Sequence, residues 1–555
     1  MWILALNITH DASICLMKDE KIVLHLKEER LTHIKHDTEL LYSIDLIKNY
    51  TDSIDYVAYS YLHNNNLYIG PYKKIFKKNN INVKEWIDYS QFHHDLHAHC
   101  AFLNSGFDDG VCLVVDGAGS DKFYGKENES IYNFNSKTDF NCIYKTVVGY
   151  NNEIIPKDSP KYVEKEKKIG CGMAYASISS FMGWGDHGEG RVMGISSYGK
   201  FDSMINPLIT SKGANESIFK LYDYNHMHEM GAIFLPYPYV SSFKDLDENF
   251  TKLSNLCYKL QKNFEDYIFN LINKSIELTG KTNIILTGGC FLNCVSNYKI
   301  LKKLPKNINV YVDPLCADDG ITVGSSKFTY INHYIKNSIG PKSIKLTSLY
   351  LGQEIKYNYN LNSNESEVNC KPKDVAKLLS NGNIVALCQG KSESGPRALG
   401  NRSILFDPRV ENGKEIVNRV KKREWWRPFA GTVLLEHARE WFDMNRLEES
   451  PHMMFAVDVW EDKRKLIPNI THVDGTCRIQ TLRKEYNPNY YELIEEFYKL
   501  TEVPILFNTS FNLAGDTIVE TIDDAFNTLR NSEIEYMYLP EISKLIYVPN
   551  EKNIC

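Results

Sequence analysis

Long apolar runs, closely paired cysteines and a strong excess of either charge are all missing from this sequence of 555 residues. No window approaches the roughly 20 apolar residues that a membrane-spanning helix needs. Thirteen cysteines are present, but none stands in a C-x-x-C pair, and the closest spacing is Cys290 to Cys294. Neither a zinc ribbon nor a disulfide framework is therefore indicated. The net charge of -6 argues against bulk nucleic acid as a dominant partner.

The N-terminal residues predict a first β-strand, at positions 2–6, rather than a secretory signal. The apolar stretch is too short for a signal, and no basic segment precedes it. Alternating apolar residues predict further strands at 12–17 and 22–26, and a helical pattern covers about 253–278. We therefore expect a cytoplasmic protein without a membrane partner.

The length of the chain favours two or three domains, each with its own core. Composition shifts towards Lys, Ser, Asn and Tyr over residues 332–364, where the periodicity also fades. Such a shift is typical of a linker, so we expect a domain junction near residues 335–370.

Two apolar segments of the N-terminal half predict strands that end in glycine turns. Residues 111–115 lead into Asp116-Gly117, and residues 283–286 lead into Gly288-Gly289. Glycine lets the backbone approach a phosphate or a metal-bound ligand closely. Together with the N-terminal hairpin, these turns are similar to the nucleotide-binding turns of the actin-like ATPase fold, although each is weak alone.

A histidine pair with the spacing of metal ligands stands at His93 and His97. On a helix this spacing places both imidazoles on one face, as a metal requires. From the spacing alone, a solvated surface or a packed turn is an equally good interpretation. A zincin-type protease is excluded, because His94 stands where that motif has its glutamate base.

A third ligand is best sought as a carboxylate at another strand end. Asp318 and Asp319 follow an apolar segment and precede a helical run. They could bind a metal, but from the residues alone helix capping by Asp319 is slightly favoured. Two histidines and one carboxylate with open positions suit Fe(II) or another divalent first-row metal, which could polarise a carbonyl.

Basic residues concentrate in the glycine- and proline-rich turns of the C-terminal part. This arrangement is expected for clamping phosphate groups. For any single arginine, a surface ion pair is as good an interpretation as a phosphate contact. For the whole group of basic residues, surface ion pairs are a much poorer interpretation. The set comprises Arg397, Arg402, Lys421, Arg423, Arg427 and Arg478.

Taken together, these segments resemble the NodU/CmcH-type O-carbamoyltransferases, a family that modifies antibiotics, nodulation factors and related natural products. The resemblance covers nearly the whole chain. It implies a mixed α/β protein, with an actin-like ATPase domain at residues 1–350 and a YrdC-like domain at residues 351–555. It is carried by residues 7–12, 28–30, 93–102, 116–119, 188–199, 288–293, 318–324, 395–405, 421–430, 471–481 and 504–512.

The resemblance implies a reaction in two steps. The C-terminal domain would form carbamoyl-adenylate from carbamoyl phosphate and ATP, with Mg²⁺, and the N-terminal domain would transfer the carbamoyl group to an acceptor hydroxyl. The family pattern assigns His93, His97 and Asp318 to a divalent metal, with Fe(II) preferred, beside a catalytic Asp116. His10 is the candidate base for the hydroxyl proton, and a turn histidine that faces water is an equal alternative.

The remaining site residues also follow from the resemblance. In the N-terminal domain the nucleotide contacts would be Gly117, Gly288, Gly289 and Asn293. In the C-terminal domain the phosphate and carbamoyl contacts would be Arg397, Lys421, Arg427, Arg478 and Ser510, with His472, Asp474 and Asn508 nearby. The chain departs from the family at Asp95, Leu96 and His99, and the added polar groups would shape the acceptor pocket or meet water.

Two other functions stay open. A fused threonylcarbamoyl transferase that acts on tRNA would share both domain types, and a non-catalytic actin-like nucleotide-binding protein would share the fold. The acceptor is expected to be a natural product, a sugar or a glycan, and a hydroxymethylated nucleobase in DNA is less favoured. The lysines between Lys73 and Lys84 are interpreted as a solvated face. The sequence does not predict the oligomeric state.

Overall fold

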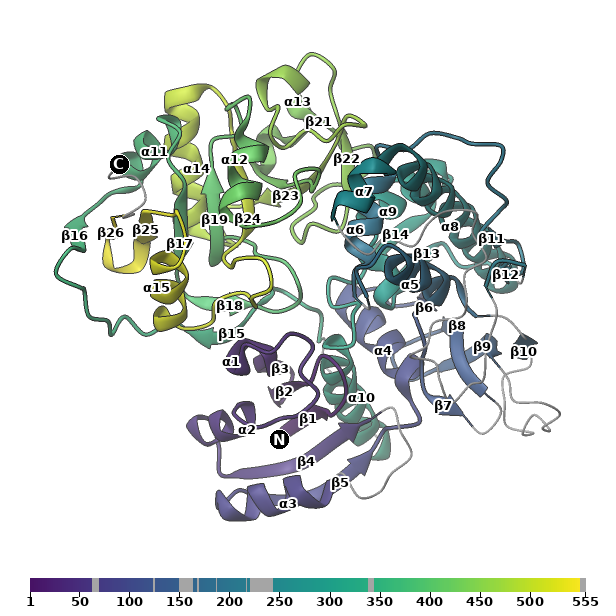
Figure 1. Cartoon of the computed structure of the whole chain (residues 1–555). Helices are drawn as coiled ribbons and strands as arrows, with labels where there is room; N and C mark the ends of the chain where they lie inside the picture. Colours follow the sequence, from purple (N-terminus) through teal and green to yellow (C-terminus); the bar gives the residue numbers. More distant parts are fainter. Residues whose placement is uncertain are drawn as a thin grey trace. The chain divides into compact units, whose positions relative to one another are not determined.

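The computed structural model divides into two compact units (Figure 1). The first consists of Met1–Val23 and Thr38–Leu346, and the second of Leu24–Asp37 and Thr347–Cys555. A short segment near the N-terminus therefore belongs to the second unit. The structure describes residues 1–61, 69–122, 125–148, 163–166, 169–185, 187–215, 217–219, 243–337 and 344–549.

Two mixed sheets of the first unit follow the same plan. In the first sheet, β1 pairs antiparallel with β2 and parallel with β4. In the second sheet, β6 pairs antiparallel with β8 and parallel with β13. This repeated topology is the actin-like fold that the family resemblance implies. The first sheet has the order β3 (Lys21–Lys27), β2 (Ser13–Lys18), β1 (Trp2–Asn7), β4 (Ser53–Ser60), β5 (Asn82–Asp88). The second has the order β10 (Val163–Glu166), β9 (Phe140–Val148), β8 (Gly125–Phe134), β6 (Gly110–Val115), β13 (Asn283–Thr287), β14 (Asn309–Val312), with β7 (Asp121–Lys122) beside β8.

Helices α4 (His93–Ser105) and α10 (Gly320–Lys336) pack against each other between the two sheets (Figure 1). Helix α10 contacts β1 and β2, and helix α4 contacts β6 and β13. Strands β1 and β6 are buried along almost their whole length, as expected for strands covered on both faces. The two helices therefore form the interior layer of this unit.

Further helices of the first unit lie outside this layer. They are α2 (Ser43–Leu46), α3 (Ile69–Lys78), α5 (Cys171–Phe181), α6 (Glu189–Ser196), α7 (Phe243–Glu248), α8 (Phe250–Thr279) and α9 (Cys294–Lys303). The predicted helix at 253–278 corresponds to α8, and the five predicted strands match β1, β2, β3, β6 and β13 within one residue. Among the described residues, no helix is both long and apolar enough to cross a membrane.

The second unit is built on one mixed sheet of ten strands. It is an α/β unit, and its likeness to YrdC stays a prediction. The sheet has the order β16 (Ser366–Asn369), β26 (Lys544–Tyr547), β25 (Tyr536–Leu539), β17 (Val385–Cys388), β19 (Arg402–Phe406), β24 (Ile505–Ser510), β20 (Ala430–Leu434), β23 (Thr476–Leu482), β22 (Ala456–Val459), β21 (Phe442–Asp443). A separate pair joins β15 (Tyr350–Glu354) to β18 (Lys391–Glu393). The helices are α1 (Glu29–Thr32), α11 (Pro372–Ser380), α12 (Gly413–Val420), α13 (Ala438–Trp441), α14 (Pro488–Thr501) and α15 (Ile522–Arg530).

The contact between α4 and α10 depends on a glycine. A Cβ atom at Gly324 of α10 would lie 2.1 Å from the carbonyl oxygen of Leu96 on α4. No side chain fits at that distance, so the two helices approach closely only because position 324 has none.

We expect Gly324→Ala to lower the free energy of unfolding by about 1–3 kcal/mol, since the helices must separate to admit the methyl group. Thermal or urea unfolding of the full chain measures this. Gly190→Ala on α6 is the matched control, because nothing lies within 4 Å of a Cβ there. Equal unfolding midpoints for the two variants would show that the close approach is not required.

Candidate metal centre and anion site

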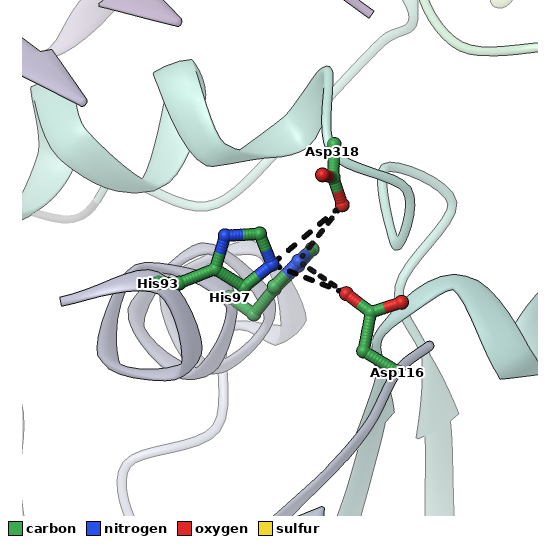
Figure 2. A group of neighbouring side chains, drawn as sticks. All are labelled: His93, His97, Asp116 and Asp318. Atoms are coloured by element: carbon green, nitrogen blue, oxygen red, sulfur yellow. Dashed lines mark hydrogen bonds and ion pairs between the residues drawn. The ribbon is translucent and has the colours of Figure 1, made fainter. Parts of the chain in front are cut away.

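Four side chains from three separate segments of the first unit meet at one point (Figure 2). His93 and His97 lie on α4, Asp116 directly follows β6, and Asp318 stands just before α10. Their candidate ligand atoms all lie within 4.8 Å of one another. His93 Nε2 is 3.2 Å from Asp116 Oδ2 and 3.7 Å from Asp318 Oδ1, and His97 Nε2 is 3.4 and 3.6 Å from the same two oxygens.

Asp116 is oriented by the main chain around it. The N–H groups of Gly117 and Gly289 donate to Oδ1 at 2.8 and 3.2 Å, which leaves Oδ2 for the histidines. Gly288 has a φ of 96°, and a Cβ there would lie 2.2 Å from the carbonyl oxygen of Val115. The glycine turn after β13 therefore places a donor on Asp116, whereas contact of these glycines with a nucleotide stays a prediction.

The first turn of α4 is fixed by a chain of hydrogen bonds that the sequence did not reveal. The His93 N–H donates to Ser120 Oγ at 3.1 Å, and the Ser120 N–H donates to Glu127 Oε2 at 3.1 Å. Glu127 is fully buried and forms an ion pair with Lys145. These polar residues stand in a strand and a loop far from the histidine motif, and no spacing rule connects them to it.

The acid groups of this cluster are held ionised. Burial opposes the charge on Asp116, but the hydrogen bond from His93 and the nearby His97 hold its pKa well below the usual range. Burial also opposes the charge on His97, yet Asp116 and Asp318 raise the pKa of that imidazole to about 10. The charges therefore balance only when cations stand beside both carboxylates.

The cluster fits a divalent cation. His97 is completely buried, and within the described part of the chain its Nε2 makes no hydrogen bond although two carboxylate oxygens lie close by. Together with the second imidazole and the two carboxylates, this nitrogen completes a donor set of the kind that first-row divalent metals prefer. Asp116 is as well placed as Asp318 to be a ligand, which the spacing of the motifs did not indicate.

His10 also reaches this cluster. Its Nε2 lies 3.0 Å from Asp318 Oδ2, and its side chain is 38% exposed. The charge of Asp318 raises the pKa of His10 to about 9, against the opposing effect of burial. His10 is thus paired with Asp318 as long as no other cation shares that carboxylate.

Two polar residues near the cluster, His99 and Asp319, lie differently from what the sequence indicated. His99 was expected to shape an acceptor pocket or to meet water, but it is fully buried and packs on Phe140 and Phe328. Burial lowers its pKa to about 4. Asp319 is the N-cap residue of α10, yet its side chain accepts no capping hydrogen bond.

In the second unit, several predicted contacts share one face of the sheet. Arg478 and Asn508 lie on either side of Ala430 in neighbouring strands, so their side chains project on the same side. Asn508 donates to the carbonyl oxygen of Ala398, next to Arg397, at 3.3 Å. Within the described residues, Arg478 Nε and Asn508 Oδ1 are buried without a hydrogen-bond partner.

Lys421 joins this group through Ser510. Its ammonium donates to the main-chain oxygen of Ser510 and, at 3.0 Å, to Asn512 Oδ1. Burial and the charges of Arg423 and Arg427 hold the pKa of Lys421 well below its usual range. A bound anion would relieve this repulsion, so the arrangement is suited to phosphate.

Other predicted residues of the second unit have local partners. Arg427 pairs with Glu424 at 3.2 Å, and His472 with Asp474 at 3.5 Å. Arg402 was grouped with the phosphate clamp, but it is fully buried and donates to main-chain oxygens such as that of Glu520. Its role is therefore to hold the main chain together.

The lysine-rich segment forms a solvated face, as the sequence indicated. Lys73, Lys74, Lys77 and Lys78 are exposed on α3, whereas Tyr72 and Phe76 of the same helix are buried. Lys84 pairs with Asp55.

Comparison with known proteins gives one consistent result. A family model described as Carbamoyltransferase N-terminus matches residues 42–326, and one described as Carbamoyltransferase C-terminus matches residues 376–544. Nodulation protein NolNO of Sinorhizobium fredii is 29% identical, over 95% of this chain and 77% of that protein. Nodulation protein NolO of Bradyrhizobium diazoefficiens is 30% identical, over 80% of this chain and 76% of that protein.

Two further proteins are similar over smaller parts. The 3'-hydroxymethylcephem-O-carbamoyltransferase of Streptomyces clavuligerus is 31% identical, over 47% of this chain and 48% of that protein. Among solved structures, full-length HypF in its phosphate- and nucleotide-bound form matches with a TM-score of 0.34 and 14% identity. That match covers 61% of this chain and 47% of HypF.

We expect His97→Ala to remove the metal from the purified protein, because one of the buried imidazole ligands is lost and the two carboxylates no longer have that imidazole beside them. Metal analysis by mass spectrometry, after growth with iron, should fall from about one ion per chain to near zero. His333→Ala is the control, since this half-buried histidine lies outside the cluster. Unchanged metal content in a folded His97→Ala variant contradicts the assignment.

Proposed function

Because this chain belongs to the carbamoyltransferase family, we propose that it is an ATP-dependent enzyme that carbamoylates a hydroxyl group in two steps. The family transfers carbamoyl groups, and the cephem relative is named as an O-carbamoyltransferase. The proposal is carried by two polar sites of opposite character, one suited to a cation and one to an anion, in two separate units.

In the first proposed step, carbamoyl phosphate, ATP and one water give carbamoyl-adenylate, phosphate and pyrophosphate. The second unit is suited to this step, because Arg478 and Asn508 lie on one face of its sheet. Lys421, which follows α12, donates to Asn512 just after the same strand as Asn508. The two basic side chains would bind phosphate oxygens, and Ser510 would be held in place by Lys421. Arg397, Arg427, His472 and Asp474 are proposed as further contacts to the donor or the nucleotide.

In the second proposed step, the acceptor oxygen attacks the carbamoyl carbon. A new C–O bond forms, the bond from that carbon to the AMP oxygen breaks, and the proton of the hydroxyl leaves. His10 is the proposed base for this proton, since it stands at the exposed edge of the cluster, 3.0 Å from Asp318. A cation held by Asp318 would remove the pairing that raises the pKa of His10, and the imidazole could then accept a proton. Gly117, Gly288, Gly289 and Asn293 are proposed to face the nucleotide.

His93, His97, Asp116 and Asp318 would hold the divalent metal of the transfer site, with Fe(II) as the preferred ion. A metal bound there would act as a Lewis acid on a carbonyl or phosphoryl oxygen. The protein's own contribution is to fix the ligands. The main chain orients Asp116, and Ser120 holds the helix start that carries His93.

The acceptor is proposed to be a hydroxyl of a natural product, a sugar or a glycan. The relatives named as nodulation proteins and as a cephem carbamoyltransferase support this range. A hydroxymethylated base in DNA fits less well, because the lysines of α3 are simply solvated and the net charge is negative.

The two steps should be separable by substitution. We expect His93→Ala to abolish carbamoyl transfer, while pyrophosphate release that depends on carbamoyl phosphate stays within about twofold of the wild type. The reason is that His93 belongs to the first unit and the adenylate site to the second. Transfer to an acceptor panel is followed by mass spectrometry. Undiminished transfer would exclude the cluster from the reaction.

The converse variant tests the second unit. We expect Arg397→Ala to reduce pyrophosphate release by about 100-fold or more, because a bidentate phosphate contact is lost. Supplying synthetic carbamoyl-adenylate should restore transfer in this variant. A folded Arg397→Ala protein that forms the adenylate at the wild-type rate would contradict the proposed site.

A further inference from the structure

Arg397 stands in the turn between β18 and β19, residues 394–401, which we call the arginine turn. Gly400 gives this turn a φ of 110°, and a Cβ there would lie 2.2 Å from the ring of Tyr490. Glycine is also the most flexible residue, so a turn built on it needs partners that hold it. The main chain after Arg397 is therefore expected to be bound on more than one side.

Glu393 holds the N–H groups of the arginine turn. Its side chain is 3% exposed, and its Oε1 accepts from Leu399 and Asn401 at 2.6 and 2.8 Å. The same oxygen accepts from Arg402, the first residue of β19, at 3.2 Å. A buried carboxylate oxygen that accepts three N–H groups is a strong anchor.

Gln480 of β23 holds the carbonyl side of the same turn. It is buried, and its Nε2 donates to the carbonyl oxygen of Leu399 at 2.9 Å. The carbonyl oxygen of Ala398 accepts from Asn508 at 3.3 Å. The two carbonyl groups that directly follow Arg397 are therefore both bound by side chains of the sheet.

The orientation of the Gln480 amide is set by its other neighbours. Its Oε1 accepts from the Thr432 hydroxyl at 2.9 Å and from Asn508 Nδ2 at 3.3 Å. The reversed amide would direct an oxygen at the carbonyl oxygen of Leu399 and an NH₂ at the NH₂ of Asn508. Only one orientation satisfies the network, and it is the one that donates to the arginine turn.

Gln480 also lies beside the anion site. It stands two residues after Arg478 on β23, so the two side chains project from the same face of the sheet. Asn508, which is bonded to Gln480, projects on this face as well. Gln480 therefore connects the face that carries Arg478 to the main chain that follows Arg397.

We propose that Gln480 is a positioning residue, which holds Arg397 in place relative to Arg478 so that both can bind phosphate. This inference rests on the proposed function of the second unit. A guanidinium binds phosphate through two N–H groups in a fixed geometry, so a shift of about 1 Å in the main chain is enough to lose one of them. Gln480 acts through Arg397 and touches no substrate itself.

Gln480→Met tests this role. Methionine fills nearly the same volume, but it donates no hydrogen bond to Leu399. The Tyr350 hydroxyl still donates to that oxygen at 2.9 Å, so the turn stays folded but less firmly held. We expect the kcat/KM for carbamoyl phosphate in pyrophosphate release to fall by about 10- to 100-fold. Transfer from synthetic carbamoyl-adenylate, which is assigned to the first unit, should stay within about twofold of the wild type.

Thr481→Val is the matched control. Thr481 is the next residue of β23, is buried, and projects on the opposite face of the sheet, where its Oγ1 accepts from the Ser450 N–H at 2.7 Å. This substitution also removes one buried hydrogen bond, but that bond leads to Ser450 and not to the arginine turn. We expect a similar fall in the unfolding midpoint and an unchanged kcat/KM. An equal loss of kcat/KM in both variants would show that Gln480 is only structural.

A double substitution shows whether Gln480 acts through Arg397. If it does, Gln480→Met should cause no further loss of pyrophosphate release in the Arg397→Ala protein, because the side chain that it positions is already gone. Two losses that multiply would contradict the inference.

Binding without turnover separates this inference from the proposed function. Calorimetric titration of the full chain with inorganic pyrophosphate needs neither a carbamoyl group nor an acceptor. Arg397→Ala and Gln480→Met should each weaken binding by about tenfold or more, and Thr481→Val should not. An unchanged affinity in Arg397→Ala would overturn the proposed phosphate contact, and this inference with it. Weaker binding in Arg397→Ala with wild-type affinity in Gln480→Met would overturn this inference alone.

Discussion

The burial of two carboxylates beside two imidazoles is the constraint on which the first unit depends. Asp116 and Asp318 direct oxygens at the same pair of histidine nitrogens. Two negative charges this close repel each other by an amount on the order of a few kcal/mol at the effective dielectric of a protein. Only cations between them make the arrangement stable. The packing of α4 on α10, the hydrogen bonds to Asp116 and the buried Glu127 all serve to keep this cluster in one geometry.

Local sequence pattern was sufficient for the elements that carry the site. Strands with continuous burial and their glycine turns were predicted within one residue, because apolar runs that end in Gly-Gly or Asp-Gly have few other structures available. The spacing of His93 and His97 placed both on one face of a helix. The equal position of Asp116 was not predictable, since it arises from pairing between β6 and β13, which are far apart in the chain.

Helix α4 shows why the remaining polar residues were misjudged. A helix motif is usually interpreted with one buried and one solvated face, so that His99 was expected at a pocket or in water. Helix α4 is instead covered by α10 and by the second sheet, and every residue of it except Asp95 is buried. The side chain of His99 therefore packs among phenylalanines, and burial keeps it uncharged. Tertiary covering of this kind leaves no mark in the periodicity of a single helix.

The second unit also contains buried charged groups, and these are suited to a different kind of ligand. The sequence showed a group of basic residues but could not separate Arg402, which binds only main-chain oxygens, from Lys421, whose charge is poorly compensated. Nor could it place Leu24–Asp37 in this unit, because the segment adjoins strands of the other one. Once placed, each polar site has its own charge balance. Two carboxylates beside a buried imidazole nitrogen suit a metal cation, and the buried basic groups around Lys421 suit phosphate. The opposite charge of the two sites is therefore what suits them to different ligands, as the proposed function requires.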